Sequence, residues 1–315
     1  MSAADINKVA VIGTGTMGPG IAQVLAGRGL EVVIHDIDPE QLEKSRQTLD
    51  QNLGLFKGAG IISEADVPKI KSRIKEAGDL AEAVKGADLV LEVIPEMMDL
   101  KTALMTQLDG LCDEGVILAS NTSGLSISKL AAATKRPAQV VGMHWWNPPI
   151  IIPVIEVIRG EKTSQATVET TTALVKKIGK VPVLVKKDVP GFLGNRLQYA
   201  LMREAIALLD EGVASAEDID TMIKAGIGFK FPVMGPLETI DMAGMDIYSR
   251  VSQYLYGSLN SDSSPPPLVA ERGEKNQLGL KTGQGFYDYK GVDIPALMGG
   301  RIKKLLVLLK ELDYL

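Results

Sequence analysis

Cysteine and histidine are both rare in this sequence. It has one cysteine, Cys112, and two histidines, His35 and His144, in 315 residues. A lone cysteine excludes an internal disulfide framework and gives a structural zinc site no thiolate companions, so we expect no bound metal and a reducing, cytoplasmic location. Because histidine titrates near neutral pH, His144 is a candidate for proton transfer.

An excess of positive charge and a long apolar run are also missing. The chain carries 34 basic and 39 acidic residues, for a formal net charge of −5. That balance gives no overall basic field for nucleic acid or anionic lipid. The N-terminus has no signal-peptide pattern, and no stretch predicts a membrane span. We therefore expect a soluble globular protein, long enough for two domains, whose partners are small molecules.

A glycine-rich turn follows the first predicted strand, residues 8–12, and opens a helical pattern. Its sequence is Gly-Thr-Gly-Thr-Met-Gly. Gly13 suits the tight turn, Gly15 lets a pyrophosphate approach the backbone, and Gly18 lets the helix pack closely on the strand. Isolated glycine turns are common, but the order strand, turn, helix is the context that dinucleotide binding requires.

The rest of the predicted dinucleotide site lies at the helix start and after the next strand. Thr16 and Met17 stand at the helix N-terminus, which favours negative charge. Asp36 ends the second predicted strand, about 20 residues beyond the first glycines, where a carboxylate accepts from ribose hydroxyls and repels a 2′-phosphate. NAD is therefore favoured over NADP. By strand alternation His35 points to the opposite face and is interpreted as a packed residue.

Strand and helix signals alternate as far as residue 187, which predicts a Rossmann-type doubly wound parallel sheet. The later predicted strands are 87–94, 116–119, 139–143, 150–158 and 181–186, and the predicted helices are 39–77 with an interruption at 57–60, 100–111, 126–133 and 167–178. Ligands in such sheets sit beyond the carboxyl ends of the strands. This rule gives weight to Glu92, Glu96, Ser123 and His144. Ser123 has a second interpretation as part of a helix N-cap.

His144 and Glu156 form the candidate catalytic pair. The Asn147-Pro148-Pro149 turn between them reverses the chain and can bring the two side chains together. A histidine is suited to take a proton at neutral pH, and a carboxylate on its far nitrogen fixes the tautomer. The alternative interpretation is a packed core histidine and an unrelated acid on an edge strand.

A change of pattern after residue 187 predicts a second, all-helical domain at 188–290, followed by a C-terminal tail at 291–315. Its predicted helices are 192–211, 216–225 and 237–256, and the tail carries an amphipathic pattern at 301–312 with Ile302, Leu305, Leu309 and Leu312 available for burial. Asn195 opens the first of these helices, where it faces the predicted cleft or caps the helix. The tail has no functional interpretation beyond packing or dimer contact.

With these residues in view, the chain from 8 to 289 resembles the L-3-hydroxyacyl-CoA dehydrogenase family. The motifs that carry the resemblance are Gly-Thr-Gly-Thr-Met-Gly, Ser-Asn-Thr-Ser, His-Trp-Trp-Asn-Pro, Asp-Val-Pro-Gly-Phe, Gly-Pro-Leu-Glu and Lys-Thr-Gly-Gln-Gly-Phe-Tyr, in that order. The resemblance implies hydride transfer between a hydroxyl carbon and NAD, with His144 as general base and Glu156 as its orienting acid. It also implies that Ser123 and Asn195 bind the substrate oxygen or the histidine, and that Glu96 and Lys101 lie near the nicotinamide.

The substrate that the resemblance implies is a short 3-hydroxyacyl-CoA such as 3-hydroxybutyryl-CoA, and the family also implies a homodimer. Two departures from the family pattern are Ser-Gly at 123–124 and Trp-Trp-Asn-Pro-Pro at 145–149. The double proline, together with Asn-Arg-Leu-Gln-Tyr at 195–199, looks like relatives that oxidise free sugar acids, carnitine or a pyridine alcohol, which keeps an alternative open. Only Lys44, Arg46 and Lys57 are obvious phosphate donors in the helical excursion over which family members bind CoA. A third hypothesis is a non-catalytic NAD-binding structural protein.

Overall fold

The computed structural model describes residues 5–314, which form two compact units. The first unit ends at Arg196 and resumes at Ile302, and the second is Leu197–Arg301. The sequence pattern predicted domain boundaries after residues 187 and 290. The final stretch of the chain thus belongs to the first unit.

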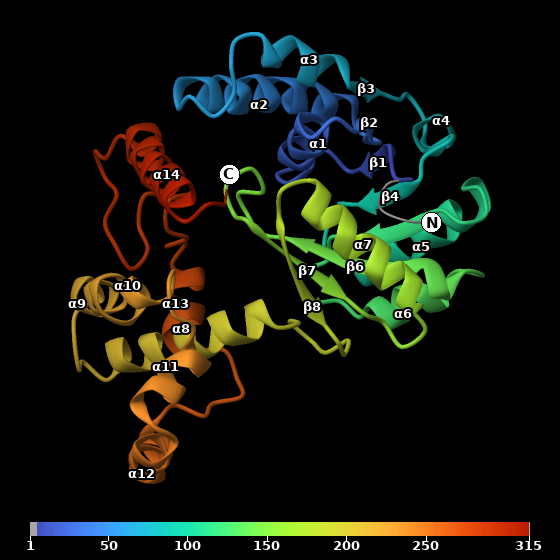
Figure 1. The fold of residues 1–315 in the computed structure, drawn as a ribbon. Coiled ribbons are helices and arrows are strands. Elements are labelled where there is room, and N and C mark those ends of the chain that lie inside the picture. Colours follow the sequence, from blue (N-terminus) through green and yellow to red (C-terminus); the bar gives the residue numbers. More distant parts are fainter. Residues whose placement is uncertain (1–4, 315) are drawn as a thin grey trace. The chain divides into compact units, whose positions relative to one another are not determined.

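The first unit is built on one eight-stranded sheet with the order β3-β2-β1-β4-β5-β6-β7-β8 (Figure 1). The Rossmann-type fold predicted from the sequence is confirmed. The strands are β1 (Lys8–Ile12), β2 (Glu31–His35), β3 (Ile74–Glu76), β4 (Leu89–Glu92), β5 (Ile117–Ser120), β6 (Val140–Trp145), β7 (Val154–Ile158) and β8 (Val181–Val185). Its helices are α1 (Gly18–Gly27), α2 (Pro39–Gly58), α3 (Asp66–Ser72), α4 (Leu80–Val84), α5 (Met98–Leu111), α6 (Ile127–Ala132) and α7 (Gln165–Lys177), with a short 3-10 turn at Pro137–Gln139.

Two apolar layers cover the two faces of this sheet, and strand alternation assigns side chains to them. Along β1, Val9 and Val11 pack with α1, α2, α3 and α7, whereas Ala10 and Ile12 pack with α4, α5 and α6. Strands buried on both faces read as continuous apolar runs, as these do. The sheet therefore holds the strand ends rigidly.

The sheet is parallel except between β6 and β7, which corrects the prediction of a wholly parallel sheet and fits the chain reversal predicted at residues 147–149. β6 and β7 are antiparallel, with His144 opposite Glu156, and β8 runs parallel to β7. A short turn can join only antiparallel neighbours, because a parallel pair needs a long crossover. The turn is also longer than predicted. The backbone N–H groups of Ile151 and Ile152 both donate to the Pro148 carbonyl, so the strand begins at Val154 and not at residue 150.

Two further element predictions are wrong in part. The segment predicted as helix up to residue 77 ends in β3, which pairs with β2 and extends the sheet at its edge. The helix predicted at 237–256 is two helices that break at Gly244, whose φ of +98° no ordinary helix residue adopts. Local periodicity detects neither an edge pairing nor a single left-handed residue.

The second unit is all-helical, as predicted. Its helices are α8 (Gly194–Asp210, which starts in the first unit), α9 (Ala216–Met222), α10 (Gly228–Lys230), α11 (Pro236–Ala243), α12 (Met245–Leu255), α13 (Pro267–Glu274) and the first turns of α14 (Ile294–Glu311), with a π-helical turn at Ile223–Ile227 and a 3-10 turn at Tyr256–Ser258. No helix in the described range 5–314 is long and apolar enough to cross a membrane.

The last turns of α14 belong to the first unit and form a small apolar cluster there. Leu306 and Leu309 are buried against Ile150 and Ile151, and side chains from the end of α2 pack around them. Leu305, which the amphipathic pattern offered for burial, is exposed, and Leu306 takes its place. Leu309 is buried as predicted, and Ile302 packs against the cluster.

Candidate active site

The glycine turn has the geometry that a dinucleotide needs. Gly13 has φ +106°, and a Cβ there would lie 2.6 Å from the Val93 carbonyl oxygen. A Cβ on Gly18 would lie 2.3 Å from the Gly13 carbonyl oxygen, so the helix start packs directly on the turn. A Cβ on Gly15 would meet nothing within 4 Å, which leaves open space above the turn.

The polar groups around this space fit NAD. Among the described residues, no acceptor is found for the backbone N–H groups of Gly15, Thr16 and Met17, which are the groups that bind a pyrophosphate at a helix start. The backbone N–H and the hydroxyl of Thr14 both donate to Asp36 Oδ2, at 2.7 and 3.1 Å. A carboxylate with about four acceptor sites can still accept from ribose hydroxyls.

His144 and Glu156 are directly hydrogen-bonded to each other. His144 Nδ1 lies 2.7 Å from Glu156 Oε2, and both residues are buried, at 4% and 2% exposure. The antiparallel pairing of β6 and β7 sets the two residues opposite each other. No partner of His144 Nε2 is found among the described residues. The arrangement is a tethered imidazole with one nitrogen left for a ligand.

Glu156 is fixed as an anion by four donors. Its Oε1 accepts from the backbone N–H groups of Leu193 and Gly194, both at 3.0 Å, and its Oε2 accepts from His144 and, at 3.3 Å, from Trp146 Nε1. Burial alone would raise the pKa of Glu156, but the hydrogen bonds from His144, Gly194 and Leu193 outweigh it and lower the pKa. The carboxylate therefore stays charged beside the imidazole.

Ser123 and Asn195 are joined to each other and to Glu96. Asn195 Nδ2 donates to the Ser123 carbonyl at 2.8 Å, and the Ser123 backbone N–H donates to Glu96 Oε1 at 2.9 Å. The helix cap that Ser123 might have served is formed by Ser126, which accepts from the Lys129 backbone N–H. Among the described residues the Ser123 hydroxyl has no partner, so it is free for a ligand.

Lys101 connects this chain of contacts to a buried carboxylate at the end of β4. It is 1% exposed and lies 2.6 Å from Glu92 Oε1 and 3.4 Å from Glu96 Oε2. Ser120, at the end of β5, donates to the other Glu92 oxygen at 2.5 Å. A buried lysine and carboxylate with these partners form a rigid support for Glu96.

A continuous path of contacts thus runs from Lys101 through Glu96, Ser123 and Asn195 to the helix start that holds Glu156. The strand-end rule predicted Glu96 and Ser123, and the resemblance implied Lys101 and Asn195. Neither indicated the Leu193 and Gly194 backbone donors or Trp146. A sequence pattern contains no signal for backbone donors, and the paired tryptophans did not reveal which ring faces inward. Trp145 is buried in the core, whereas Trp146 lies beside His144, with ring centroids 5.4 Å apart.

Fold and site together define an NAD-dependent oxidoreductase. The model of the 3-hydroxyacyl-CoA dehydrogenase NAD-binding domain matches residues 8–189, and that of the C-terminal domain matches residues 191–289. The chain belongs to the 3-hydroxyacyl-CoA dehydrogenase family, as the resemblance predicted, and NAD is its cofactor.

Two kinds of relative are similar to the chain. It is 43% identical over 309 residues, 98% of this chain and 99% of the other, to the 5-formyl-3-hydroxy-2-methylpyridine 4-carboxylate 5-dehydrogenase of Mesorhizobium japonicum. It is 40% identical over 283 residues, 90% of this chain and 99% of the other, to the 3-hydroxybutyryl-CoA dehydrogenase of Clostridioides difficile.

The similar solved structures are of the same two kinds. A crystal structure of the pyridine carboxylate dehydrogenase, described as an NAD+-dependent dismutase, has a TM-score of 0.91 at 42% identity and covers 98% of this chain and 99% of that one. A (S)-3-hydroxybutyryl-CoA dehydrogenase from Ralstonia eutropha has a TM-score of 0.75 at 39% identity and covers 90% of this chain and 99% of that one.

Proposed function

We propose that this dehydrogenase oxidises a small compound that carries no CoA, of the pyridine carboxylate type, with His144 as general base and Glu156 as its orienting acid. The sequence favoured a 3-hydroxyacyl-CoA and kept the CoA-free compound as the alternative. The observation that favours the CoA-free compound is the position of the last turns of α14, which pack on the end of α2. By the resemblance, the helical excursion that begins with α2 is the segment over which family members bind CoA.

The tail that contains α14 lies beyond the family models, which end at residue 289. A match over 309 of the 315 residues has to include most of this tail, and the pyridine carboxylate dehydrogenase has such a match. The 3-hydroxybutyryl-CoA dehydrogenase is covered almost completely by 283 residues. The tail is therefore a feature shared with the CoA-free relative.

The ion pairs of the cations in this helical excursion also argue against binding of a CoA phosphate there. Arg46 forms ion pairs with Glu43 and Glu76, and Lys57 lies 2.9 Å from Glu64. Lys44 lies 3.8 Å from Glu40. Each of the three phosphate donors noted in the sequence thus has a carboxylate neighbour that a phosphate would have to displace. Exposed ion pairs of this kind are weak, so the packing of α14 on the end of α2 remains the main support for a CoA-free substrate.

The chemistry follows from the free atoms of the site. NAD supplies the acceptor for the hydride that leaves the substrate carbon. His144 Nε2 takes the hydroxyl proton of an alcohol or a hydrated aldehyde, and Glu156 stabilises the resulting imidazolium through Nδ1. The Ser123 hydroxyl and the Asn195 amide are suited to donate to the oxygen as it becomes a carbonyl. Loss of one proton and one hydride balances the oxidation.

The test compares two substrates. NADH formation is measured with 5-formyl-3-hydroxy-2-methylpyridine 4-carboxylate and with 3-hydroxybutyryl-CoA, and we expect kcat/KM to favour the first by about 100-fold or more, since site groups built for one substrate are left unpaired by another. Free coenzyme A should not inhibit the reaction. Efficient turnover of the thioester, or inhibition by micromolar coenzyme A, would refute the proposal and restore the acyl-CoA interpretation.

A further inference from the structure

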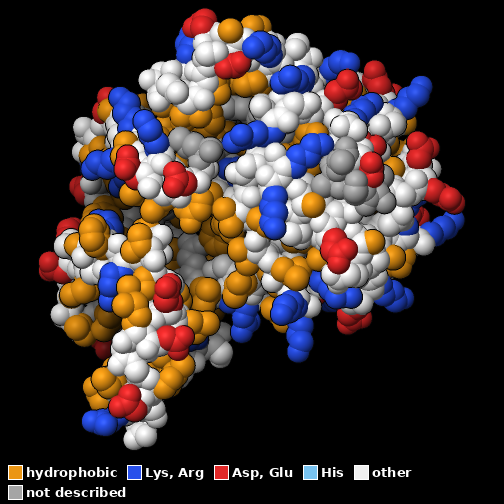
Figure 2. All heavy atoms as spheres, in the orientation of Figure 1, with side chains coloured by type: hydrophobic (Ala, Val, Ile, Leu, Met, Phe, Trp, Pro, Cys, Tyr) orange, Lys and Arg blue, Asp and Glu red, His pale blue; other side chains and the backbone are white. Residues whose placement is uncertain are grey.

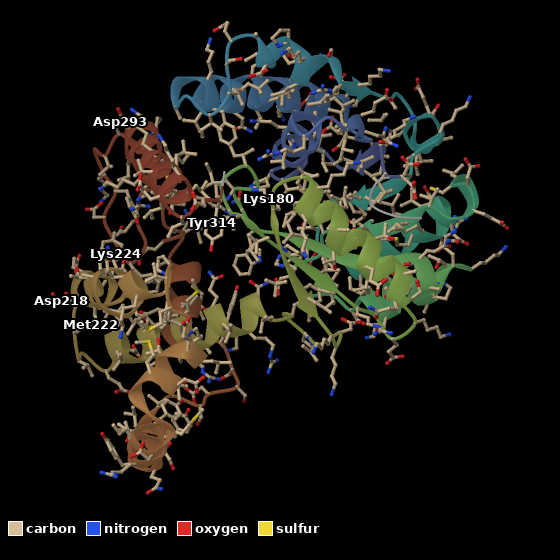
Figure 3. All side chains as sticks on the ribbon, viewed as in Figure 1. Lys180, Asp218, Met222, Lys224, Asp293 and Tyr314 are labelled. Carbon is tan, nitrogen blue, oxygen red and sulfur yellow. The ribbon has the colours of Figure 1, made fainter. Side chains whose placement is uncertain are left out.

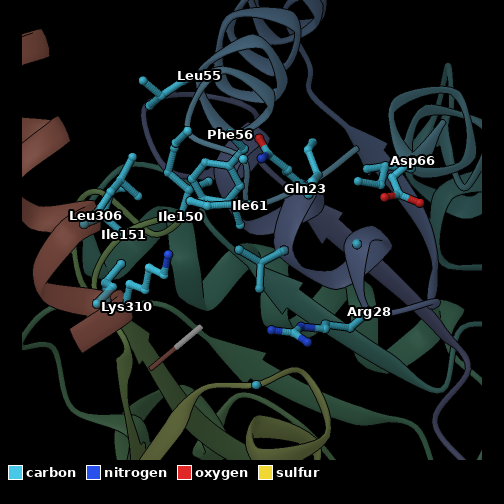
Figure 4. A pocket seen from close by; sticks show the side chains of 18 of the residues that line it. Gln23, Arg28, Leu55, Phe56, Ile61, Asp66, Ile150, Ile151, Leu306 and Lys310 are labelled. Atoms are coloured by element: carbon cyan, nitrogen blue, oxygen red, sulfur yellow. The ribbon is translucent and has the colours of Figure 1, made fainter. Parts of the chain in front are cut away.

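The first unit contains a cavity of about 1400 Å³ that the dehydrogenase chemistry does not use. It lies between α1, the end of α2, α3, the start of β8 and the last turns of α14 (Figure 4). His144, Glu156, Ser123 and Asn195 are not among its lining residues. Its volume exceeds what a drug-sized ligand needs.

One wall of this cavity is apolar. The side chains that form it come from the end of α2, the loop after it, the turn before β7 and α14, and they are Leu55, Phe56, Ile61, Ile150, Ile151 and Leu306. Figure 4 shows them grouped on one side of the cavity. An apolar surface of this kind favours the aliphatic or aromatic body of a ligand.

The remaining wall is basic. Six of the lining residues are lysine or arginine and one is acidic, Asp66, which already pairs with Lys69 at 3.3 Å. The side chains of Arg28 and Lys310 have no ion-pair or hydrogen-bond partner among residues 5–314. Figure 4 shows both side chains directed into the cavity from opposite sides. Unpaired cations that face one space favour an anion there.

Lys180, which Figure 3 labels, also lines the cavity, and its ammonium group is mostly buried. Its Nζ donates to the carbonyls of Pro149 and Ile152, both at 2.8 Å, and one of its three protons is left over. Burial, with a smaller effect from Arg28, lowers the pKa of Lys180 to about 8. No carboxylate in the described part of the chain compensates this charge.

Gln23 is an independent sign that this cavity takes a polar ligand. It lines the cavity, is 3% exposed, and its Oε1 is buried without a hydrogen-bond donor in the described part of the chain. No partner of its Nε2 is found there either. Buried amides in folded proteins nearly always have partners, so an unpaired one calls for an explanation.

We propose that this cavity binds an amphiphilic organic carboxylate, with its apolar body on the α2–α14 wall and its head group between Arg28, Lys180 and Lys310. Gln23 completes the site as an amide partner of the head group. The site lies apart from the hydride-transfer residues. It rests on the proposed function, because the CoA of a thioester would run over the end of α2, which lines this cavity. Its ligand bridges the last turns of α14 to α1, so binding should hold the tail in place.

The probe is octanoate, titrated by calorimetry into the full chain with NAD present. We expect one octanoate per chain, and octanol, acetate and inorganic phosphate should each bind at least about tenfold more weakly, because each lacks the charge or the apolar body. Arg28→Gln and Lys310→Gln should each weaken octanoate about tenfold. Turnover of the proposed substrate should be unchanged in both variants.

Lys129→Gln is the matched control, since Lys129 is an exposed cation on α6 outside the cavity. It should bind octanoate as the unchanged chain does. The proposal is overturned if octanoate does not bind, if octanol or phosphate binds equally well, or if Arg28→Gln and Lys310→Gln both leave the affinity unchanged. Circular dichroism on each variant ensures that a lost affinity is not a lost fold.

Discussion

At the scale of single residues, the decisive feature is an imidazole with one nitrogen fixed and the other free. His144→Ala should lower turnover by roughly 10²- to 10⁴-fold, the usual contribution of a positioned general base. NAD affinity should stay nearly unchanged, because the glycine turn and Asp36 do not contact this histidine. Steady-state kinetics and NAD titration measure the two quantities separately, and an unaffected rate would remove the base assignment.

Trp146→Phe is the matched comparison for His144→Ala. It keeps an aromatic ring beside the histidine and removes only the N–H that donates to Glu156 at 3.3 Å. The loss of turnover should be about fivefold, because a long hydrogen bond contributes little and three other donors remain. A loss as large as that of His144→Ala would mean that the tryptophan itself contacts the reacting group.

The charge of Glu156 predicts how stability depends on pH. Its pKa in the folded chain lies below the usual 4.5, so the unfolded chain binds the proton more readily. The contribution of Glu156 to stability is complete above about pH 4.5 and is lost as the pH falls through the lowered value. Urea unfolding of Glu156→Gln should therefore show a weaker loss of stability between pH 5 and 3 than the unchanged chain.

Glu161→Gln controls for the general effect of removing one carboxylate, because Glu161 is exposed and its side chain has no partner in residues 5–314. Its pH dependence should follow that of the unchanged chain. If Glu161→Gln and Glu156→Gln behaved alike, the lowered pKa of Glu156 would have no part in stability.

At the scale of elements, the sequence predicted what depends on local pattern and missed what depends on pairing in space. The strand, glycine turn and helix at residues 8–27 were found because each step has its own residue signal. The turn at 147–149 indicated that the chain reverses before β7, but it did not show that β7 joins the same sheet antiparallel to β6, because that depends on the partner strand. The same holds for β3, whose three residues form a strand only because β2 is beside them.

The residues of the site show the same difference between what the local pattern predicts and what it does not. His144, Ser123 and Glu96 stand at or just beyond strand ends, where a position in the chain translates into a position in space. Glu156 lies in the middle of β7, opposite His144. The backbone N–H groups that hold Glu156 come from a different part of the chain, Leu193 and Gly194. Any residue type could donate them, so no residue identity indicates this role.

The attachment of α14 is a testable element-scale feature. Leu306 is buried in the cluster with Ile150 and Ile151, whereas its neighbour Leu308 is 48% exposed. Leu306→Ala should destabilise the packed tail by about 2 kcal/mol, the lower end for a buried leucine, because the cluster is small. Limited proteolysis should then cut within residues 302–314 much faster. Leu308→Ala should leave the cutting rate unchanged, and equal rates for both variants would contradict the packing.

At the scale of the whole molecule, the helical unit differs from the sheet unit in how little it buries. The single chain leaves every side chain of the described range 197–301 at least partly exposed. Apolar side chains among them include Leu197, Phe229, Leu237 and Met242, each more than half exposed. Figure 2 shows hydrophobic side chains gathered on the surface of this unit. Apolar surface this extensive indicates that the unit packs against a further apolar surface.

We expect a second copy of the chain to supply that surface, as the family resemblance implied. Light scattering at micromolar concentration should give twice the mass of the 33.7 kDa chain, and thermal stability should rise with protein concentration. Leu237→Glu should shift the mass toward that of a single chain, because a charge inside an apolar contact is costly. Leu111→Glu, at an exposed leucine of the sheet unit, should leave the mass unchanged. A monomer at all concentrations would require the helical unit to be stable with its apolar side chains in water, which contradicts the burial argument.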